Sequence, residues 1–248
     1  MFYDAHAHLD LLNTKELKKT LSDAQAKKVS KIVSCSTSFA SNKKNLALAK
    51  KYPSVLAGIG LYPLDIVELN EKELDKAFSF FEKHISKASA IGEIGMDFKR
   101  CTKKEEQEKQ EYWFLEFLSL ANKYNKTVII HSRFAQRQVL ELLEKENAKK
   151  VLLHSFVDSL KLMKKAASLG YFASVGPVIL QNEQIQKNIA SFPLENLLFE
   201  TDSPIKFNNE SIFSDKIAEI ASKTAELQNN SLDQVEKIQE KNFKSLFG

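Results

Sequence analysis

Histidine is rare in this chain and is concentrated where buried strands are expected. All but one of the five histidines stand at or near the end of a short apolar run; the set is His6, His8, His84, His131 and His154. Side chains two residues apart on a strand point to the same side, so His6 and His8 are expected to face one interior together. A single buried histidine is usually a satisfied core residue, but two polar rings facing one core need a reason. We interpret this pair as metal ligands and His84 as a surface or helix residue.

Two carboxylates have similarly unusual surroundings. Glu93 lies within the apolar segment AIGEIGMDF, where an ionised group is costly unless it is paired or binds a metal. A salt bridge to a lysine or arginine is the alternative. Asp202 follows an apolar run in LLFETDSP, as His131 does in VIIHSR and His154 in VLLHSF. Each of these three could instead cap a following helix.

Nitrogen and oxygen donors without cysteine suit Zn²⁺, Mn²⁺ or Mg²⁺. Cys35 and Cys101 match no ligand spacing and are expected to be two free thiols rather than a disulfide. Gly92 and Gly95 flank Glu93 and are expected to leave room for a bulky centre. The sequence therefore predicts a metal centre built from histidines and carboxylates.

Eight short apolar runs are expected to be the strands that position these groups. They are residues 2–7, 31–36, 54–61, 88–95, 127–131, 150–154, 170–175 and 196–201. Helical patterns stand between them, which predicts a parallel sheet covered on both sides. At this length we favour a TIM-like (β/α)₈ barrel forming a single domain over residues 1–248, with a doubly wound open sheet as the alternative. Polar residues at the carboxyl ends of barrel strands are where catalytic groups belong.

Composition and charge bear on whether the protein binds nucleic acid, is secreted or contacts membranes. The net charge of +4 does not by itself indicate a nucleic-acid binder, and nearly all the basic residues are lysines. The N-terminal residues MFYDAHAHLD do not resemble a signal peptide, and no apolar run approaches the ~20 residues that span a bilayer. We expect a cytoplasmic protein that does not contact membranes.

Five motifs stand in the order of a known family: DAHAHLD, GEIGMDF, IIHSR, LLHSF and ETDSP. With them the chain resembles the TatD-related deoxyribonucleases, within the amidohydrolase-like metal hydrolases. The closing segment NFKSLFG resembles the family's C-terminal helix. The resemblance implies a barrel fold and metal-dependent hydrolysis, typically of phosphodiesters in DNA.

The resemblance also implies a role for each motif residue. His6, His8 and Asp202 would hold one divalent ion, His131 and His154 a second, and Glu93 would bridge the two. The ions (Mg²⁺, Mn²⁺ or Zn²⁺) would activate a water molecule for in-line attack on phosphorus. Glu93 and Asp202 are the expected catalytic residues, with Asp202 orienting or deprotonating that water. The expected neighbours of the ligands are Asp4, Asp10 and Asp97 as partners of the histidines, and Ser203 as a further partner or a helix cap.

Two segments depart from the family pattern. The family has a histidine in GxHP after the third strand, whereas this chain has GLYP, so Tyr62 takes that position and is expected to contact substrate. After His154 the family has Cys-Phe-Ser-Gly, and here residues 155–158 are SFVD. Both departures bear on the identity of the substrate more than on metal binding.

Arg133 is expected to hold a phosphate through a bidentate contact, a structural ion pair being the alternative. Lys99 and Arg100 extend a small basic patch. Aromatic residues beside the ligands could stack on bases, although packing is the commoner role at such positions; they are Phe98, Phe134 and Phe156.

Three functions are compatible with these residues. The first is a deoxyribonuclease acting on single-stranded DNA or a DNA end, expected to be a monomer. The second is a hydrolase of another ester or amide, such as a deacylase, because fold does not determine substrate. The third is a metal-binding protein without activity, which the complete set of expected ligands disfavours.

Overall fold

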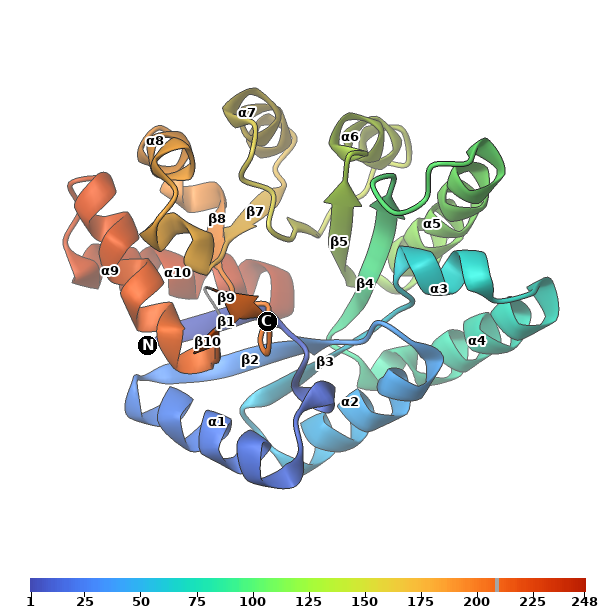
Figure 1. The fold of residues 1–248 in the computed structure, drawn as a ribbon, viewed down its shortest axis with the longest axis horizontal. Helices are drawn as coiled ribbons and strands as arrows, with labels where there is room; N and C mark the ends of the chain where they lie inside the picture. Colours follow the sequence, from blue (N-terminus) through green and yellow to red (C-terminus); the bar gives the residue numbers. More distant parts are fainter. Residues whose placement is uncertain (208–209) are drawn as a thin grey trace.

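Eight parallel strands follow one another around a barrel, each paired with the next in chain order (Figure 1). The computed structural model describes residues 1–207 and 210–248. The strands are β1 (Phe2–Ala7), β2 (Val29–Cys35), β3 (Val55–Ile59), β4 (Ala90–Asp97), β5 (Thr127–Arg133), β6 (Val151–Leu153), β7 (Phe172–Val175) and β8 (Leu197–Phe199). The TIM-like fold is confirmed, and the open sheet is excluded as the architecture.

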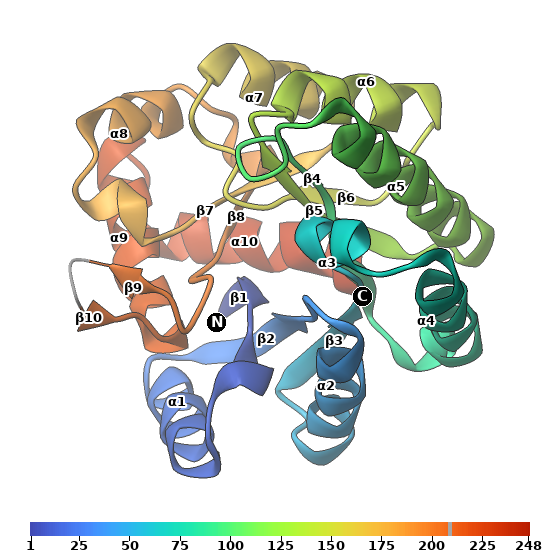
Figure 2. The ribbon, with the colours of Figure 1, turned by 45° about the vertical axis from the view of Figure 1, so that its right-hand side comes forward.

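The helices surround the strands, as Figure 2 shows. They are α1 (Thr14–Ala26), α2 (Phe39–Lys51), α3 (Pro63–Glu68), α4 (Glu71–His84), α5 (Lys104–Tyr124), α6 (Gln136–Lys145), α7 (Leu160–Ser168), α8 (Glu183–Ala190), α9 (Ile217–Leu227) and α10 (Leu232–Phe247). A small antiparallel hairpin, β9 (Lys206–Phe207) with β10 (Glu210–Ser211), follows β8. Neither this hairpin nor helices α2, α3 and α8 follow from the apolar periodicity of the sequence.

The strand ends differ from the sequence-based boundaries where the ligands lie. β4 continues to Asp97 and β5 to Arg133, two residues beyond the predicted limits, whereas β8 ends at Phe199. His154 and Asp202 therefore stand on the loops just after β6 and β8. Parallel strands place all of these ends at one mouth of the barrel.

The seam between β8 and β1 is closed by individual hydrogen bonds. The Asp202 amide donates to the His6 carbonyl at 3.0 Å, and the His8 amide donates to the Ser203 carbonyl at 2.6 Å. The buried Asp4 carboxylate accepts from the Thr201 amide at 3.0 Å and from its hydroxyl at 2.6 Å. These bonds join the first ligand segment of the chain to the last.

Helix α10 covers the amino ends of the strands. Phe243 stacks on Tyr3 with ring centroids 4.4 Å apart, and the Thr127 hydroxyl donates to the Leu246 carbonyl at 2.5 Å. Above this layer, small and branched side chains such as Ala5 and Ile129 fill the interior. The barrel is therefore packed below its mouth, and the candidate ligands lie at the carboxyl ends of the strands.

Candidate metal centre

All six predicted ligands meet at the carboxyl ends of the strands. They are supplied by β1, β4, β5 and the loops after β6 and β8; the residues are His6, His8, Glu93, His131, His154 and Asp202. Glu93 has a side chain only 3% exposed, and its ion-pair partners are four histidines. The sequence alternative, a salt bridge from Glu93 to lysine or arginine, is wrong.

The first half of the centre faces one oxygen of Glu93. The Nε2 atoms of His6 and His8 are 3.2 Å apart and lie 3.6 and 3.4 Å from Glu93 Oε2. The same two nitrogens lie 3.4 and 3.2 Å from Asp202 Oδ1. Four donor atoms from three strand ends therefore surround one point.

The second half faces the other oxygen of Glu93. His131 Nδ1 lies 2.9 Å and His154 Nε2 3.3 Å from Glu93 Oε1. The two nitrogens are 3.3 Å from each other. One carboxylate thus divides its oxygens between two pairs of imidazoles.

These separations fit the size of a divalent ion. With metal–nitrogen bonds of about 2.0–2.1 Å, donor atoms at the corners of a tetrahedron stand about 3.3 Å apart. The donor separations given above, 2.9–3.6 Å, lie around that value. The residues present therefore suit metal ions in both halves.

Contacts on the far side of the ring hold three of the four imidazoles in place, whereas the buried Nδ1 of His6 has no hydrogen-bond partner among the described residues. The Nδ1–H of His8 donates to the Cys35 carbonyl at 2.9 Å, which leaves its Nε2 free for a ligand. His131 Nε2 lies 3.3 Å from Asp97 Oδ2. His154 Nδ1 lies 3.4 Å from Glu200 Oε1, and Glu200 also accepts from the Ser174 hydroxyl at 2.5 Å.

Glu200 is a functional candidate that is absent from the sequence-based prediction. Its side chain is 1% exposed, and it stands two residues before Asp202 in the ETDSP motif. An acidic residue directly after a buried apolar run was the available signal. The sequence pattern indicated Asp202 as the ligand and gave no role to Glu200. Glu200 is 46 residues from its partner His154, so no motif in the sequence links the two residues.

The expected carboxylate partners are only partly correct. Asp97 contacts His131 as predicted. Asp4 accepts from the backbone amide of His6 at 3.4 Å rather than from its ring, and it also bonds Thr201 across the seam. Asp10 accepts from the Asn45 amide at 3.4 Å. Ser203 does not cap a helix through its hydroxyl, which is buried without a hydrogen-bond partner among the described residues.

The glycines around Glu93 allow neighbouring strands to approach each other closely. They do not make room for a bulky metal centre, contrary to the expectation from the sequence. A Cβ on Gly95, whose φ is +137°, would lie 2.0 Å from the His131 carbonyl oxygen. A Cβ on Gly92 would lie 2.7 Å from Ile129 Cβ. The missing side chains let β4 approach β5 closely, which brings Glu93 and His131 together.

The positive charges of the histidines and the negative charges of the carboxylates in the centre stabilise one another. Burial by itself would raise the pKa of Glu93, but the charge of His154 and hydrogen bonds from His131 and His154 hold it well below its ordinary value. Burial lowers the pKa of His8, yet its hydrogen bond to Asp202 and the charge of Glu93 outweigh that and raise the pKa to about 9. Anionic oxygens thus converge where positive charge is favoured.

The two predicted substrate-binding residues lie on the same side of the mouth. The Tyr62 hydroxyl donates to Asp97 Oδ2 at 2.7 Å and lies 3.3 Å from His131 Nε2. Arg133 is half-buried at the end of β5, with no carboxylate of the described residues within ion-pair distance. Of the three candidate stacking residues, Phe156 is buried, Phe98 is half-buried and Phe134 is 70% exposed.

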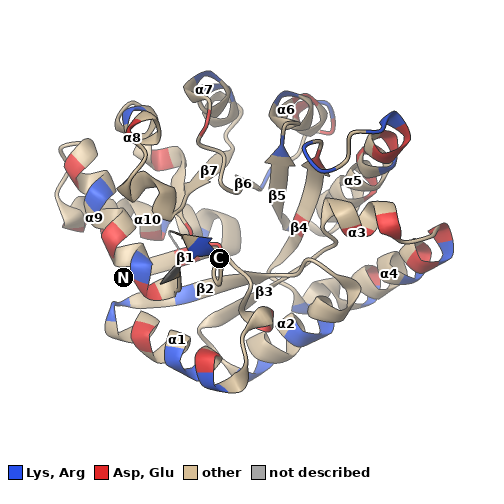
Figure 3. Cartoon of the chain, viewed as in Figure 1, with Lys and Arg blue, Asp and Glu red and all other residues tan. Residues whose placement is uncertain are grey.

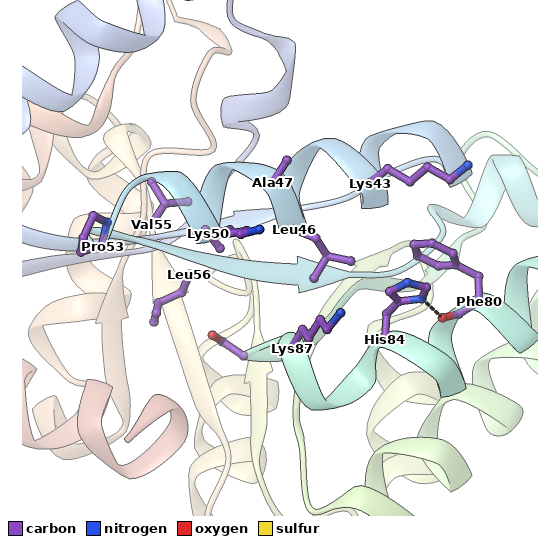
Figure 4. Close-up of a pocket in the computed structure, with 12 residues that line it drawn as sticks. Lys43, Leu46, Ala47, Lys50, Pro53, Val55, Leu56, Phe80, His84 and Lys87 are labelled. Carbon is purple, nitrogen blue, oxygen red and sulfur yellow. Dashed lines mark hydrogen bonds between the residues drawn. The ribbon is translucent and has the colours of Figure 1, made fainter.

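A groove of about 1050 Å³ lies on another part of the molecule, between α2 and α4 (Figure 4). It opens beside Val55, the first residue of β3, and Ser89, which precedes β4. This is the amino end of the strands, so the groove is separate from the centre. His84 lies there, its Nδ1–H donating to the Phe80 carbonyl, and takes no part in the ligand cluster.

Comparison with known proteins agrees with this architecture and site. A family model described as TatD related DNase matches residues 3–248, so the chain belongs to that family. It is 29% identical to human deoxyribonuclease TATDN3 over 98% of this chain and 93% of the human protein. It is 32% identical to an uncharacterized metal-dependent hydrolase of Haemophilus influenzae over 96% of this chain and 95% of that one.

Among solved structures, the TatD homologue YJJV of Escherichia coli superposes with a TM-score of 0.90 at 27% identity, over 99% of this chain and 97% of that one. The protein is a metal-dependent hydrolase acting on ester bonds, as its family membership shows. The expectation of a binding protein without activity is therefore set aside. No helix in the described part of the chain is long and apolar enough to cross a membrane.

Proposed function

We propose that the protein is a deoxyribonuclease that cleaves phosphodiester bonds in DNA with two divalent ions. The observation that carries this proposal is the division of Glu93, whose Oε2 faces His6 and His8 and whose Oε1 faces His131 and His154. A carboxylate placed in this way is suited to bridge two ions. The name of the human relative, a deoxyribonuclease, supports DNA as the substrate class.

The two halves offer different numbers of protein donors. His6, His8, Asp202 and Glu93 provide four, whereas His131, His154 and Glu93 provide three. A site with three protein donors keeps a position for water or substrate, as catalytic zinc sites do. When bound, divalent ions would lower the pKa of a water molecule and offset the charge that develops on phosphate oxygens.

Asp202, Arg133 and Tyr62 would each have a different role in binding and cleaving the substrate. Asp202 has a side chain 29% exposed, against 3% for Glu93, so its carboxylate borders the space that substrate enters. It would orient the attacking water and accept its proton. Arg133 would hold a non-bridging phosphate oxygen through its guanidinium fork. Tyr62 would contact the substrate beside His131, where its family relatives carry a histidine.

The test is metal-dependent cleavage of end-labelled single-stranded DNA by stripped protein reloaded with Mg²⁺, Mn²⁺ or Zn²⁺. Asp202→Asn is expected to reduce the rate at least about 100-fold, because losing an outer partner of a ligand already costs 10–100-fold. Asp233→Asn, an exposed aspartate on α10, is the matched control and should cleave like the unaltered protein.

The outcome also decides between substrates. Cleavage that needs both metal and Asp202 supports the nuclease, and the fragment pattern shows whether it acts from an end. Two ions bound per chain without cleavage of any strand would refute it in favour of another ester or amide, with Tyr62 as the first residue to examine. A cytoplasmic location and a monomeric state stay predictions.

A further inference from the structure

Arginine is confined to one part of this lysine-rich chain. The three arginines are Arg100, in the loop after β4, Arg133, at the end of β5, and Arg137, in the first turn of α6. Figure 3 shows basic segments at the tip of β5 and in the loop that leads from β4 to α5. Arginine differs from lysine in offering a rigid fork that matches phosphate oxygens. The residue type best suited to phosphate thus stands only beside the metal centre.

Contacts between rings and cations connect this region to the centre. The Tyr62 ring packs edge-on against His131 with centroids 4.8 Å apart. Arg100 Cζ lies 5.9 Å from the Tyr62 ring, and the adjacent Lys99 Nζ lies 5.6 Å from the Phe134 ring. We call the surface made by Tyr62, Lys99, Arg100, Arg133, Phe134 and Arg137 the arginine rim.

Two features of Phe134 are unfavourable for the stability of the folded protein. Its side chain is 70% exposed, although burial of a phenylalanine is favourable. Its φ of +59° lies in the left-handed region, which is unfavourable for a bulky residue. Such strain is concentrated at binding and catalytic sites. The folded chain therefore presents this ring to solvent without gaining core packing from it.

The three arginines of the rim form no ion pair with any described residue, although acidic residues stand near them. Among the described residues, no carboxylate lies within ion-pair distance of the three guanidinium groups. Glu111 and Glu141 line the shallow pocket beside Arg137, and Glu111 is hydrogen-bonded to the Gln138 amide. The rim therefore combines guanidinium groups that form no ion pair with the described residues and an exposed aromatic face.

We propose that the arginine rim binds the unpaired nucleotides next to the phosphate being cleaved, with one base stacked on Phe134. This inference rests on the proposed function and specifies its substrate as a single strand or a frayed DNA end. A base can stack on a protein ring only when it has left the duplex stack, and such stacking is tolerant of sequence. Arg100 and Arg137 hold phosphates on either side of that base.

The test is equilibrium binding of a fluorescent phosphorothioate octanucleotide, which resists cleavage, to the metal-loaded protein. Phe134→Leu is expected to weaken binding about tenfold, in line with the stacking energy of one base. Tyr124→Leu, an exposed aromatic at the far end of α5, is the control and should bind like the unaltered protein. Arg137→Gln should reduce the slope of log K against log salt by about 0.7, the value for one lost phosphate contact on a single strand.

The results separate this inference from the proposed function. Equal binding by the Phe134→Leu protein, or equal binding of single strand and blunt duplex, overturns the role of the rim even if DNA is cleaved. Tenfold weaker binding without cleavage of ordinary DNA supports the rim and overturns the nuclease chemistry.

Discussion

Glu93 is the residue on which both halves of the metal centre depend. Its oxygens face separate pairs of imidazoles, and three of the four rings, those of His8, His131 and His154, are held from behind by Cys35, Asp97 and Glu200. Each of these outer contacts sets which ring nitrogen points inward. The centre therefore depends on a second layer of residues as much as on the ligands.

Glu200 offers a direct test of that layer. Glu200→Gln removes the negative charge beside His154 and is expected to weaken metal binding about 10–100-fold, the usual effect of losing an outer partner. Isothermal titration of stripped protein with Mn²⁺ or Zn²⁺ measures it. The exposed Glu195, just before β8, provides the control Glu195→Gln. Unchanged affinity in the Glu200 variant would show that the charge of Glu200 is not needed to hold His154 as a ligand.

The clustering of the six candidate ligands could be predicted from the sequence because each stands in or directly after an apolar run. A histidine or carboxylate in a strand that is otherwise Val, Ile or Leu is conspicuous, and His6 and His8 share the strand period. Glu200 and the seam role of Asp4 could not be predicted in this way. Their partners, His154 and Thr201, are distant in sequence, and only the closed barrel brings them near.

At the level of elements, the strands were easier to predict than some of the helices. Helix α2 buries Ser41, Asn42 and Asn45 rather than a stripe of large apolar side chains. Apolar periodicity does not reveal such a helix, because its fully buried residues are polar and its apolar residues, Phe39, Leu46 and Leu48, are only partly buried. Strand ends were misplaced where ligands stand, since polar residues there look like the start of a loop although β4 and β5 continue beyond them.

Asn42 attaches helix α2 to the backbone of Gly60, and the contribution of this attachment to the free energy of unfolding can be measured. Its side chain accepts from the Gly60 amide at 2.8 Å and donates to the Gly60 carbonyl at 2.9 Å. Asn42→Ala leaves both buried backbone groups unpaired, and each such loss costs about 1–3 kcal/mol. We expect urea unfolding to show a loss of about 2–5 kcal/mol.

Asn122→Ala is the control for this experiment. The Asn122 amide makes one exposed bond, to the Glu146 carbonyl at 3.0 Å, so its loss should change stability by less than about 1 kcal/mol. Equal losses in the two variants would mean that α2 is held by its apolar contacts and not by Asn42.

For the whole molecule, we expect metal binding and folding to be coupled through the barrel ends. The six ligands come from five strands, so ions that bind the folded barrel stabilise all of those strands together. At a free metal concentration 100 times the dissociation constant, binding adds about 2.7 kcal/mol. For a chain of this size that corresponds to a rise in Tm of about 5–10 °C.

Differential scanning calorimetry of chelated and reloaded protein measures the rise. Asp202→Asn protein should show a smaller one, because it lacks a donor of the first half. Identical melting temperatures with and without metal would contradict the assignment of the cluster as a metal centre, whatever the activity.

The hydrogen-bonded seam also has a consequence for the order in which the protein is made. A ribosome completes His6 and His8 first, but Asp4 finds Thr201 and His6 finds Asp202 only after about four-fifths of the chain has been translated. Tyr3 can stack on Phe243 only after the last helix, α10, has been translated. A nascent chain therefore carries most of the ligands without the closed ring that unites them. The complete set of candidate ligands is therefore brought together only when translation is nearly complete.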